Sequence, residues 1–369
     1  MTGINIRIFI LISVFYFCAG INSLYSQGIS FLSDYLGNVL VFDNGNLKQI
    51  EHLPLKSYKI GNKSFAYEDN AENFKIYHKN FVHKLTASVT NYEMSNNYVA
   101  YKVTSLLRLF DDGNILSLSN DVGDYFLSDD VAIWFDNTQK KLKAYSEKKF
   151  YDLDDALASD RSNEVLMGKN IAAYTDSRGY MNIFYKGEII QLDYYDRIKS
   201  LVVGKDIVAF VEEPINSFQV FYKGEIIELD TFEPRSYKAG DSFLAYVDAN
   251  NYLKVFSDFN TETVSFDNPD FYEVKDELLI FGVQNYFKVY YNGKTYTLES
   301  FIPSEYLFHN NVICYLDQLG NLKFFDGNKT ETISYETLDF FELHGNIVKY
   351  AFGVSSENLY FNGRTYKND

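Results

Sequence analysis

Seven acidic residues recur at one place in an internal repeat, and they are the side chains most able to form a site. Each stands two residues after a short apolar run: Asp34, Asp69, Asp136, Asp176, Glu212, Asp248 and Asp317. In a closed repeat these carboxylates would form a ring at one end, open to a cation or a basic partner. The alternative is that each caps its own tight turn, as in Asp317-Gln-Leu-Gly320. We expect capping, because calcium needs several oxygens converging on one ion.

Other reactive side chains point to no chemistry. His78 and His83 flank Lys79-Asn80 and would make an incomplete zinc site, since no carboxylate adjoins them. His309 and His344 occupy equivalent places 35 residues apart, and we expect exposed turn residues there. Cys314 lies in an apolar run and is expected to be buried and inert. The sequence carries no nucleophile elbow, phosphate-cradling glycine loop or zinc signature, so we predict no catalytic residue, metal or cofactor.

These residues belong to a chain of 369 residues that is a repeat almost throughout. An apolar run ends ten times in a residue that we call the anchor, and the intervals between anchors average close to 35 residues. The anchors are Leu32, Tyr67, Tyr101, Trp134, Tyr174, Phe210, Tyr246, Phe281, Tyr315 and Tyr350. The one long interval, of 40 residues, separates Trp134 from Tyr174, where residues 154–164 indicate a lengthened loop.

Each copy divides into four short strands. The sequence holds 32 Tyr, 32 Phe and only five Pro, a composition that favours strands. A glycine preceded by Asn, Asp or Lys recurs between two of the strands, as at Gly187 and Gly224, and is typical of a tight antiparallel hairpin. The anchor run is apolar throughout, so both of its faces must be buried. Small antiparallel sheets covered on both faces are the blades of a β-propeller.

The repeats resemble the short-blade propellers of the WD40-like and TolB-like kind, at the level of architecture. The sequence lacks the Gly-His and Trp-Asp pairs of WD40 repeats. It also lacks the Ser-Xaa-Asp-Xaa-Gly-Xaa-Thr-Trp motif of sialidases, so the resemblance implies no activity. We predict an all-β fold: one propeller of nine or ten four-stranded antiparallel blades. Two smaller propellers and an open repeat array are the alternatives, because ten copies exceed the usual four to eight blades. The incomplete blade is either the last one or the first one, the latter if 55–60 belongs to the second copy.

The first residues predict export. Arg7 precedes an apolar stretch from Ile8 to Ile21, which is shorter than the roughly 20 residues that cross a bilayer. We therefore expect a signal peptide over 1–26, cleaved after Ser26, and a propeller domain over 27–369. The mature protein would be periplasmic, cell-surface or secreted, without membrane insertion.

Charge and repeats together define the expected function. The formal net charge of −16 argues against a nucleic-acid partner, because phosphate binding needs clustered Lys and Arg. We expect a non-enzymatic binding or scaffold propeller, a monomer, that recognises a protein or a glycan on its loop face. The alternatives are a polysaccharide-active enzyme, a hydrolase or lyase with acids from several blades, and a structural surface protein.

Overall fold

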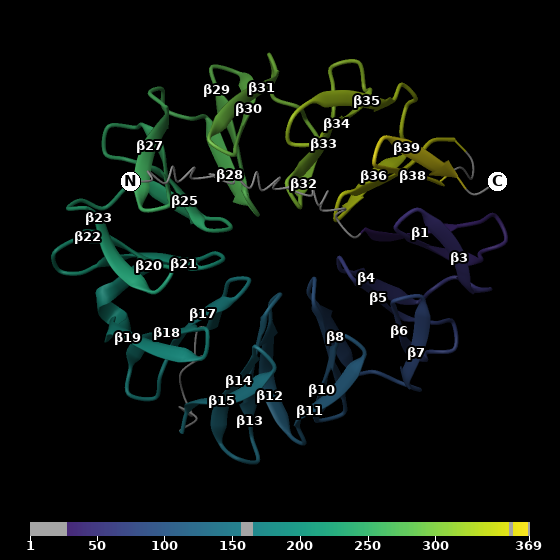
Figure 1. Cartoon of the computed structure of the whole chain (residues 1–369), viewed down its shortest axis with the longest axis horizontal. Helices are drawn as coiled ribbons and strands as arrows, with labels where there is room; N and C mark the ends of the chain where they lie inside the picture. The colour runs from purple at the N-terminus through teal and green to yellow at the C-terminus, as the bar shows by residue number, and fades with distance from the viewer. Residues whose placement is uncertain (1–27, 156–164, 354–356, 368–369) are drawn as a thin grey trace, which may run out of the picture.

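Ten small antiparallel sheets stand around a central channel in the computed structural model of the chain (Figure 1). The structure describes residues 28–155, 165–353 and 357–367. Nine of the sheets have four strands and one has three, in strict chain order. The prediction of a single propeller of nine or ten blades is confirmed, with ten as the number, and the two-ring and open-array alternatives are wrong. The one helix among the described residues is the 3-10 turn η1 (Tyr195–Arg197).

Blade 1 consists of β1 (Ile29–Ser33), β2 (Val39–Asp43) and β3 (Asn46–Glu51). In the other nine blades the innermost strands are β4 (Ser57–Ile60), β8 (Asn91–Met94), β12 (Val122–Leu127), β16 (Val165–Met167), β20 (Ile198–Val203), β24 (Ser236–Ala239), β28 (Phe271–Lys275), β32 (Tyr306–His309) and β36 (Phe340–His344). Their second strands are β5 (Ser64–Glu68), β9 (Tyr98–Val103), β13 (Val131–Asp136), β17 (Ile171–Thr175), β21 (Ile207–Glu212), β25 (Phe243–Val247), β29 (Leu278–Val283), β33 (Val312–Leu316) and β37 (Ile347–Ala351).

The third strands are β6 (Phe74–His78), β10 (Leu106–Asp111), β14 (Lys141–Ser146), β18 (Tyr180–Tyr185), β22 (Ser217–Tyr222), β26 (Leu253–Ser257), β30 (Tyr286–Tyr291), β34 (Leu322–Phe325) and β38 (Glu357–Phe361). The outermost strands are β7 (Phe81–Thr86), β11 (Asn114–Ser119), β15 (Lys149–Asp154), β19 (Glu188–Tyr194), β23 (Glu225–Asp230), β27 (Asn260–Ser265), β31 (Lys294–Glu299), β35 (Thr330–Ser334) and β39 (Arg364–Lys367).

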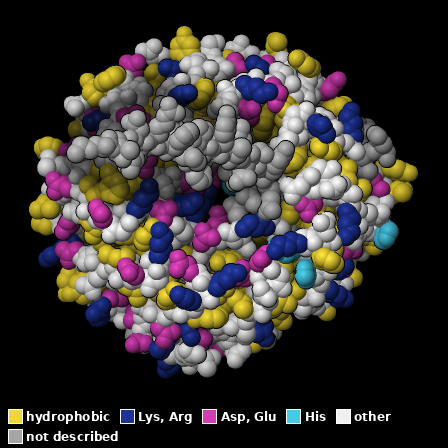
Figure 2. Space-filling view, viewed as in Figure 1, with side chains coloured by type: hydrophobic (Ala, Val, Ile, Leu, Met, Phe, Trp, Pro, Cys, Tyr) yellow, Lys and Arg dark blue, Asp and Glu magenta, His cyan; other side chains and the backbone are white. Residues whose placement is uncertain are grey.

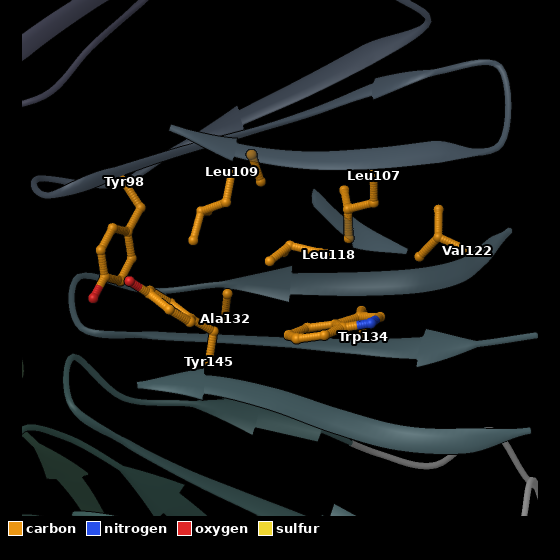
Figure 3. Close-up of a cluster of buried hydrophobic side chains, with 9 residues drawn as sticks. Tyr98, Leu107, Leu109, Leu118, Val122, Ala132, Trp134 and Tyr145 are labelled. Atoms are coloured by element: carbon orange, nitrogen blue, oxygen red, sulfur yellow. The ribbon is translucent and has the colours of Figure 1, made fainter. Parts of the chain in front are cut away.

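The core lies between blades, where the anchor strands of neighbouring sheets face each other. All ten anchors are buried, because each second strand has a sheet on both sides. Figure 3 shows one such layer, in which Trp134 of β13 packs with Leu109 and Leu118 of the preceding blade. Burying an aromatic side chain in this way removes 150 to 250 Å² from water. The apolar run predicted from the sequence therefore holds the ring together.

Successive strands run in opposite directions, so the turns divide between two faces. We call the turn between the innermost and second strands the inner turn, that between the second and third the middle turn, and that between the third and outermost the outer turn. Inner and outer turns lie on one face, the inner-turn face. Middle turns and the connections between blades lie on the other, the middle-turn face.

The incomplete blade is the first one, since β4 belongs to blade 2 and no innermost strand of blade 1 lies among the described residues. Side chains close the ring at this point. Leu32 of β1 packs with Ile347 and Leu359 of blade 10. The Lys349 ammonium, in a side chain that is almost fully buried, lies 3.9 Å from the Phe31 ring centroid.

The outer-turn glycines adopt the positive φ that the sequence predicts, 80° at Gly187 and 106° at Gly224. We expect valine at either position to lower the melting temperature, because a β-branched residue is sterically opposed there. Gly187→Val should be the more damaging, since a Cβ at Gly187 would lie 2.7 Å from the Tyr151 hydroxyl, while none lies within 4 Å at Gly224. Equal melting temperatures for wild type and both variants would contradict the turn assignment.

Candidate functional site

The predicted ring of carboxylates lies on the middle-turn face, and most of its members cap the middle turn of their own blade. Asp34, Asp69, Asp136, Asp176, Asp248 and Asp317 each accept a hydrogen bond from a backbone N–H of the turn that follows. Glu212 differs: it ends β21 and accepts from the Gln219 side chain. The structure therefore gives these acids a local structural role, and a binding role for them stays a prediction.

Asp248 shows how such a cap is built. Its Oδ1 accepts from the backbone N–H groups of Asn250 and Tyr252, both at 2.9 Å, and its Oδ2 pairs with Lys254 Nζ at 2.8 Å. Burial opposes ionisation of Asp248, but Lys254 and the two N–H groups outweigh it, so the pKa lies below its usual value. The carboxylate is stable where it stands without a bound cation.

Capping predicts a definite order of stability at Asp248. Alanine should cost about 0.5 to 2 kcal/mol, because both N–H bonds are lost. Asparagine should cost less, because it keeps an acceptor for the N–H groups and loses the ion pair with Lys254. Urea unfolding of Asp248→Ala, Asp248→Asn and the wild type measures this order.

Calcium supplies the control for the capping prediction. A cation held by Asp248 would raise the wild-type melting temperature by mass action, and Asp248→Asn would abolish that rise. We expect calcium to change neither melting temperature. A calcium-dependent rise that disappears in the variant would contradict capping.

A second set of polar side chains rings the channel at the inner turns. Blade 10 contributes Asn346, and blades 2 to 9 contribute two turn residues each: Asn62-Lys63, Asn96-Asn97, Asp129-Asp130, Lys169-Asn170, Lys205-Asp206, Asp241-Ser242, Asp276-Glu277 and Asn310-Asn311. Neighbouring turns are joined, for example by Asn97 donating to Asp130 at 2.8 Å. Figure 2 shows basic and acidic side chains gathered around the hollow at the centre of the ring.

Within this ring, one cluster crosses between blades that are not neighbours. Lys169 of blade 5 lies 2.8 Å from the Asp241 carboxylate of blade 7 and also pairs with Asp276 of blade 8. Asp276 accepts in turn from His309, at 3.0 Å. Across the channel, the Asn310 amide donates to Asn62 at 2.8 Å. The cluster borders a cavity of about 410 Å³.

The two acids of this cluster respond differently to burial. Burial opposes ionisation of Asp276, but His309 and Lys169 outweigh it and hold its pKa well below the usual value. Burial dominates at Asp241 and raises its pKa, with Lys169 opposing. Burial lowers and the two carboxylates raise the pKa of Lys169, and the carboxylates prevail. The cluster is thus a network of ion pairs that connects blades 5, 7, 8 and 9.

The middle-turn face also carries most of the loop apolar side chains that are open to solvent. Tyr35 is 84% exposed, Leu319 86% and Tyr335 79%. The set on this face comprises Tyr35, Leu36, Leu53, Tyr194, Tyr195, Ile215, Phe232, Phe266, Leu319 and Tyr335. On the opposite face, Phe259 is the one exposed large apolar residue that the described inner and outer turns contain.

The family described as "10-bladed beta propeller domain" matches residues 23–366. The chain belongs to this family. The ten blades found in the structure agree with the blade number in the family description. We refer to the protein below as the 10-bladed propeller. No curated protein matches the chain.

Several solved structures are similar to the chain at low sequence identity. The computationally designed Ika8 protein is 14% identical over 72% of this chain and 94% of its own, with a TM-score of 0.33. Hsv2p of Kluyveromyces lactis is 13% identical over 76% and 99%, with a TM-score of 0.31. Prp20p of Saccharomyces cerevisiae is 8% identical over 69% and 90%, also at 0.31. At these TM-scores the likenesses carry no argument about the 10-bladed propeller.

The histidines of the 10-bladed propeller are placed differently from the prediction. His309 and His344 are not exposed turn residues: they end β32 and β36, are partly buried, and bond to Asp276 and Ser30. Lys79-Asn80 is a two-residue turn between His78 and Phe81, with His83 further along β7, and both histidine rings contact Phe110 of the next blade. The prediction that no carboxylate adjoins them is wrong, because His78 Nε2 lies 3.1 Å from the Asp112 carboxylate. The sequence signal for the channel cluster is a polar pair at the inner turn of blades 2 to 9, such as Lys169-Asn170, which by itself indicates only a tight turn.

Two further points concern metal binding and membrane spanning. Among residues 28–155, 165–353 and 357–367, no three His, Cys, Asp or Glu side chains are arranged to hold a metal ion. In the same part of the 10-bladed propeller, no helix has the length and apolarity that a bilayer crossing requires. Cys314 is buried, and burial raises the pKa of its thiol. The predicted signal peptide, and most of the predicted loop 154–164, lie outside the described residues.

Proposed function

We propose that this protein is an exported, non-enzymatic binding propeller that recognises a protein or a glycan through its middle-turn face. A binding or scaffold role is what the propeller fold supports in general. The partner class, the location outside the cytoplasm and the monomeric state are part of this proposal.

The uneven distribution of exposed apolar side chains supports this choice of face. Aromatic residues such as Tyr35, Phe232 and Tyr335 lie open on the middle-turn face, where they contribute nothing to the cores between blades. Exposed aromatics are the side chains that most often supply binding energy at interfaces. The inner and outer turns of the opposite face consist mainly of Asn, Asp, Lys and Gly, which suit tight turns.

Two features of the sequence support export and the class of partner. Arg7 and the apolar stretch after it have the form of a secretory leader. The net charge of −16 disfavours nucleic acid and anionic membrane surfaces.

Surface variants of the mature chain test the proposal. We expect a variant with Tyr35, Phe232 and Tyr335 changed to serine to lose at least about tenfold in affinity, equivalent to 1.4 kcal/mol. Binding would be measured on a glycan array and in pull-downs from the extracellular fraction, each repeated with the variant. Thermal unfolding should be unchanged, because these side chains are exposed.

The control variant carries the same kind of change elsewhere on the surface. Phe81, Phe150 and Phe259, at the inner-turn side of the outermost strands, are exposed by 70%, 52% and 55%. Changing them to serine should leave binding intact. Loss of binding in this control, with retention in the middle-turn variant, would assign recognition to the other face.

A further inference from the structure

The residue paired across the sheet with the anchor is basic in most blades, and blades 1, 5, 6 and 10 have Leu40, Asn182, Gln219 and Asn358 there instead. In six blades this residue is basic: Lys75, Arg108, Lys143, Lys254, Lys288 and Lys323. Lys75 shows its role, since its ammonium lies 2.8 Å from the cap Asp69 and 2.7 Å from Glu51 of the preceding blade. Lys323 bridges Asp317 and Glu299 of its preceding blade in the same way. In blades 2 and 9 the lysine therefore lies in the groove between two blades and neutralises a carboxylate on each side of it.

In blade 5 this place is taken by Asn182, opposite the anchor Tyr174. The shorter amide does not bridge the blades. Asp176 instead pairs with Arg178 of its own turn at 2.8 Å, and Asp154 of blade 4 accepts from the Ser177 backbone and hydroxyl. A cavity of about 580 Å³ lies between blades 4 and 5, with Asn182 in its wall.

Two stacked tyrosines stand on the same side of blade 5 as Asn182. Tyr180 and Tyr194 have ring centroids 4.2 Å apart, and their hydroxyls are hydrogen-bonded at 2.7 Å. Arg178 extends over the Tyr180 ring and also donates to Gln191. Tyr194 and Arg178 are substantially exposed. The two tyrosines do not line the cavity itself, but Tyr180 adjoins Asp176 and Arg178, which do, so the pair lies at the edge of the groove.

Blade 7 has a closely matching set of side chains that keeps the basic residue. Tyr252 and Phe266 occupy the places of Tyr180 and Tyr194, and their rings are in contact. There the basic residue is present, because Lys254 pairs with Asp248. The difference at blade 5 coincides with the 40-residue interval between anchors, the one clear break in the repeat period.

The charges of the groove restrict its ligand. Four acidic residues in its walls outnumber two basic ones, so an anionic ligand is repelled. The acids are Asp152, Asp154, Asp155 and Asp176, and the bases are Lys141 and Arg178. Lys141 lowers the pKa of Asp152, and Arg178 with the Tyr180 backbone lowers that of Asp176 against the effect of burial. A glycosidase acid needs the opposite shift, so these two carboxylates suit hydrogen bonding to hydroxyls and not protonation of a leaving group.

We propose that the groove between blades 4 and 5 binds a neutral oligosaccharide, which stacks on the Tyr180–Tyr194 pair and is hydrogen-bonded by Asp154, Asp176 and Arg178. This inference rests on the proposed function and specifies its ligand. Sugars present hydroxyl edges and an apolar C–H face, and the groove has polar groups for the first and tyrosine rings for the second. A mostly formed pocket with a few convergent polar groups is the usual form of a small-ligand site.

The decisive variant is Asn182→Lys, which rebuilds the bridge found in blades 2 and 9. Probes are neutral fragments of β-glucan, xylan, mannan and chitin, with polygalacturonate and heparan sulfate as anionic probes, measured by calorimetry on the mature chain. We expect the wild type to bind a neutral fragment and neither anionic probe. Asn182→Lys and Tyr194→Ala should each lose at least tenfold in affinity, while Asn182→Lys keeps the wild-type melting temperature.

Tyr252→Ala in blade 7 is the matched control and should bind as the wild type does. Unchanged affinity in Asn182→Lys, binding of the anionic probes, or no binding of any neutral fragment would each overturn this inference. The same experiments distinguish failure of this inference from failure of the proposed function. If a protein partner is captured and lost only in the Tyr35, Phe232 and Tyr335 variant, recognition by the middle-turn face stands and the saccharide site does not.

Discussion

Changing Gly204 to alanine is expected to lower the free energy of unfolding by about 2 to 3 kcal/mol, the upper part of the range of about 1 to 3 kcal/mol for forced overpacking. The inner turns of successive blades touch backbone to backbone, and a Cβ on Gly204 would lie 2.2 Å from the Gly240 carbonyl oxygen. Gly168 stands in the same relation to Gly204, at 1.9 Å. Backbone cannot swing aside as a side chain can, so the turns of blades 5 to 7 would have to separate. Urea unfolding measures the loss.

Gly123 in β12 provides a matched control for Gly204. Both have ordinary φ, but a Cβ on Gly123 would meet its nearest neighbours at 3.3 Å, where a shift of a few tenths of an ångström suffices. Gly123→Ala should therefore change stability much less. If Gly204→Ala proved as mild as Gly123→Ala, the close packing of inner turns would be wrong.

Much of the fold could be predicted because it repeats. The anchors gave the number of blades, since a run that is apolar on both faces needs a sheet on each side. The outer turns were predictable where a glycine stood, as at Gly224, but not at Lys79-Asn80 or Asp258-Phe259, which adopt the same positive φ without one. In those blades the strands on either side impose the turn, a tertiary effect that local sequence does not reveal.

The candidate site could be predicted less well from the sequence, because its contacts join blades that are far apart along the chain. The pair of Lys169 and Asp276 requires turns of blades 5 and 8 to meet at the channel, and no spacing of residues indicates this. Ser95 occupies in blade 3 the place of Gly204 in blade 6, so the need for glycine comes from the neighbouring turn. The sequence shows that Asn182 stands where several other copies have a lysine. It does not show that such a lysine joins carboxylates of two neighbouring blades, which only the structure reveals.

Lys169→Met should be the second strongly destabilising change, costing about 2 to 3 kcal/mol at neutral pH. Removing one partner of a fully buried ion pair costs about 3 to 5 kcal/mol, and the Lys169 side chain keeps 28% exposure, which reduces the expected loss. Asp276 would retain His309, whereas Asp241 would lose the ammonium that opposes its burial. The double variant Lys169→Met/Asp241→Asn should therefore recover part of the stability in urea unfolding.

The cost of Lys169→Met should also shrink as the pH falls. The pKa of Asp276 lies below its ordinary value in the folded wild type, so its stabilising contribution is present above pH of about 4 and is lost as the pH falls towards the folded value. Without Lys169 the pKa values of Asp241 and Asp276 rise, and both carboxyls take up protons at a higher pH than in the wild type. A protonated carboxyl needs no ammonium, so the difference in unfolding free energy between wild type and variant should be smaller at pH 4 than at pH 7. A difference that is the same at both values would mean that Lys169 acts through its methylene packing and not through its charge.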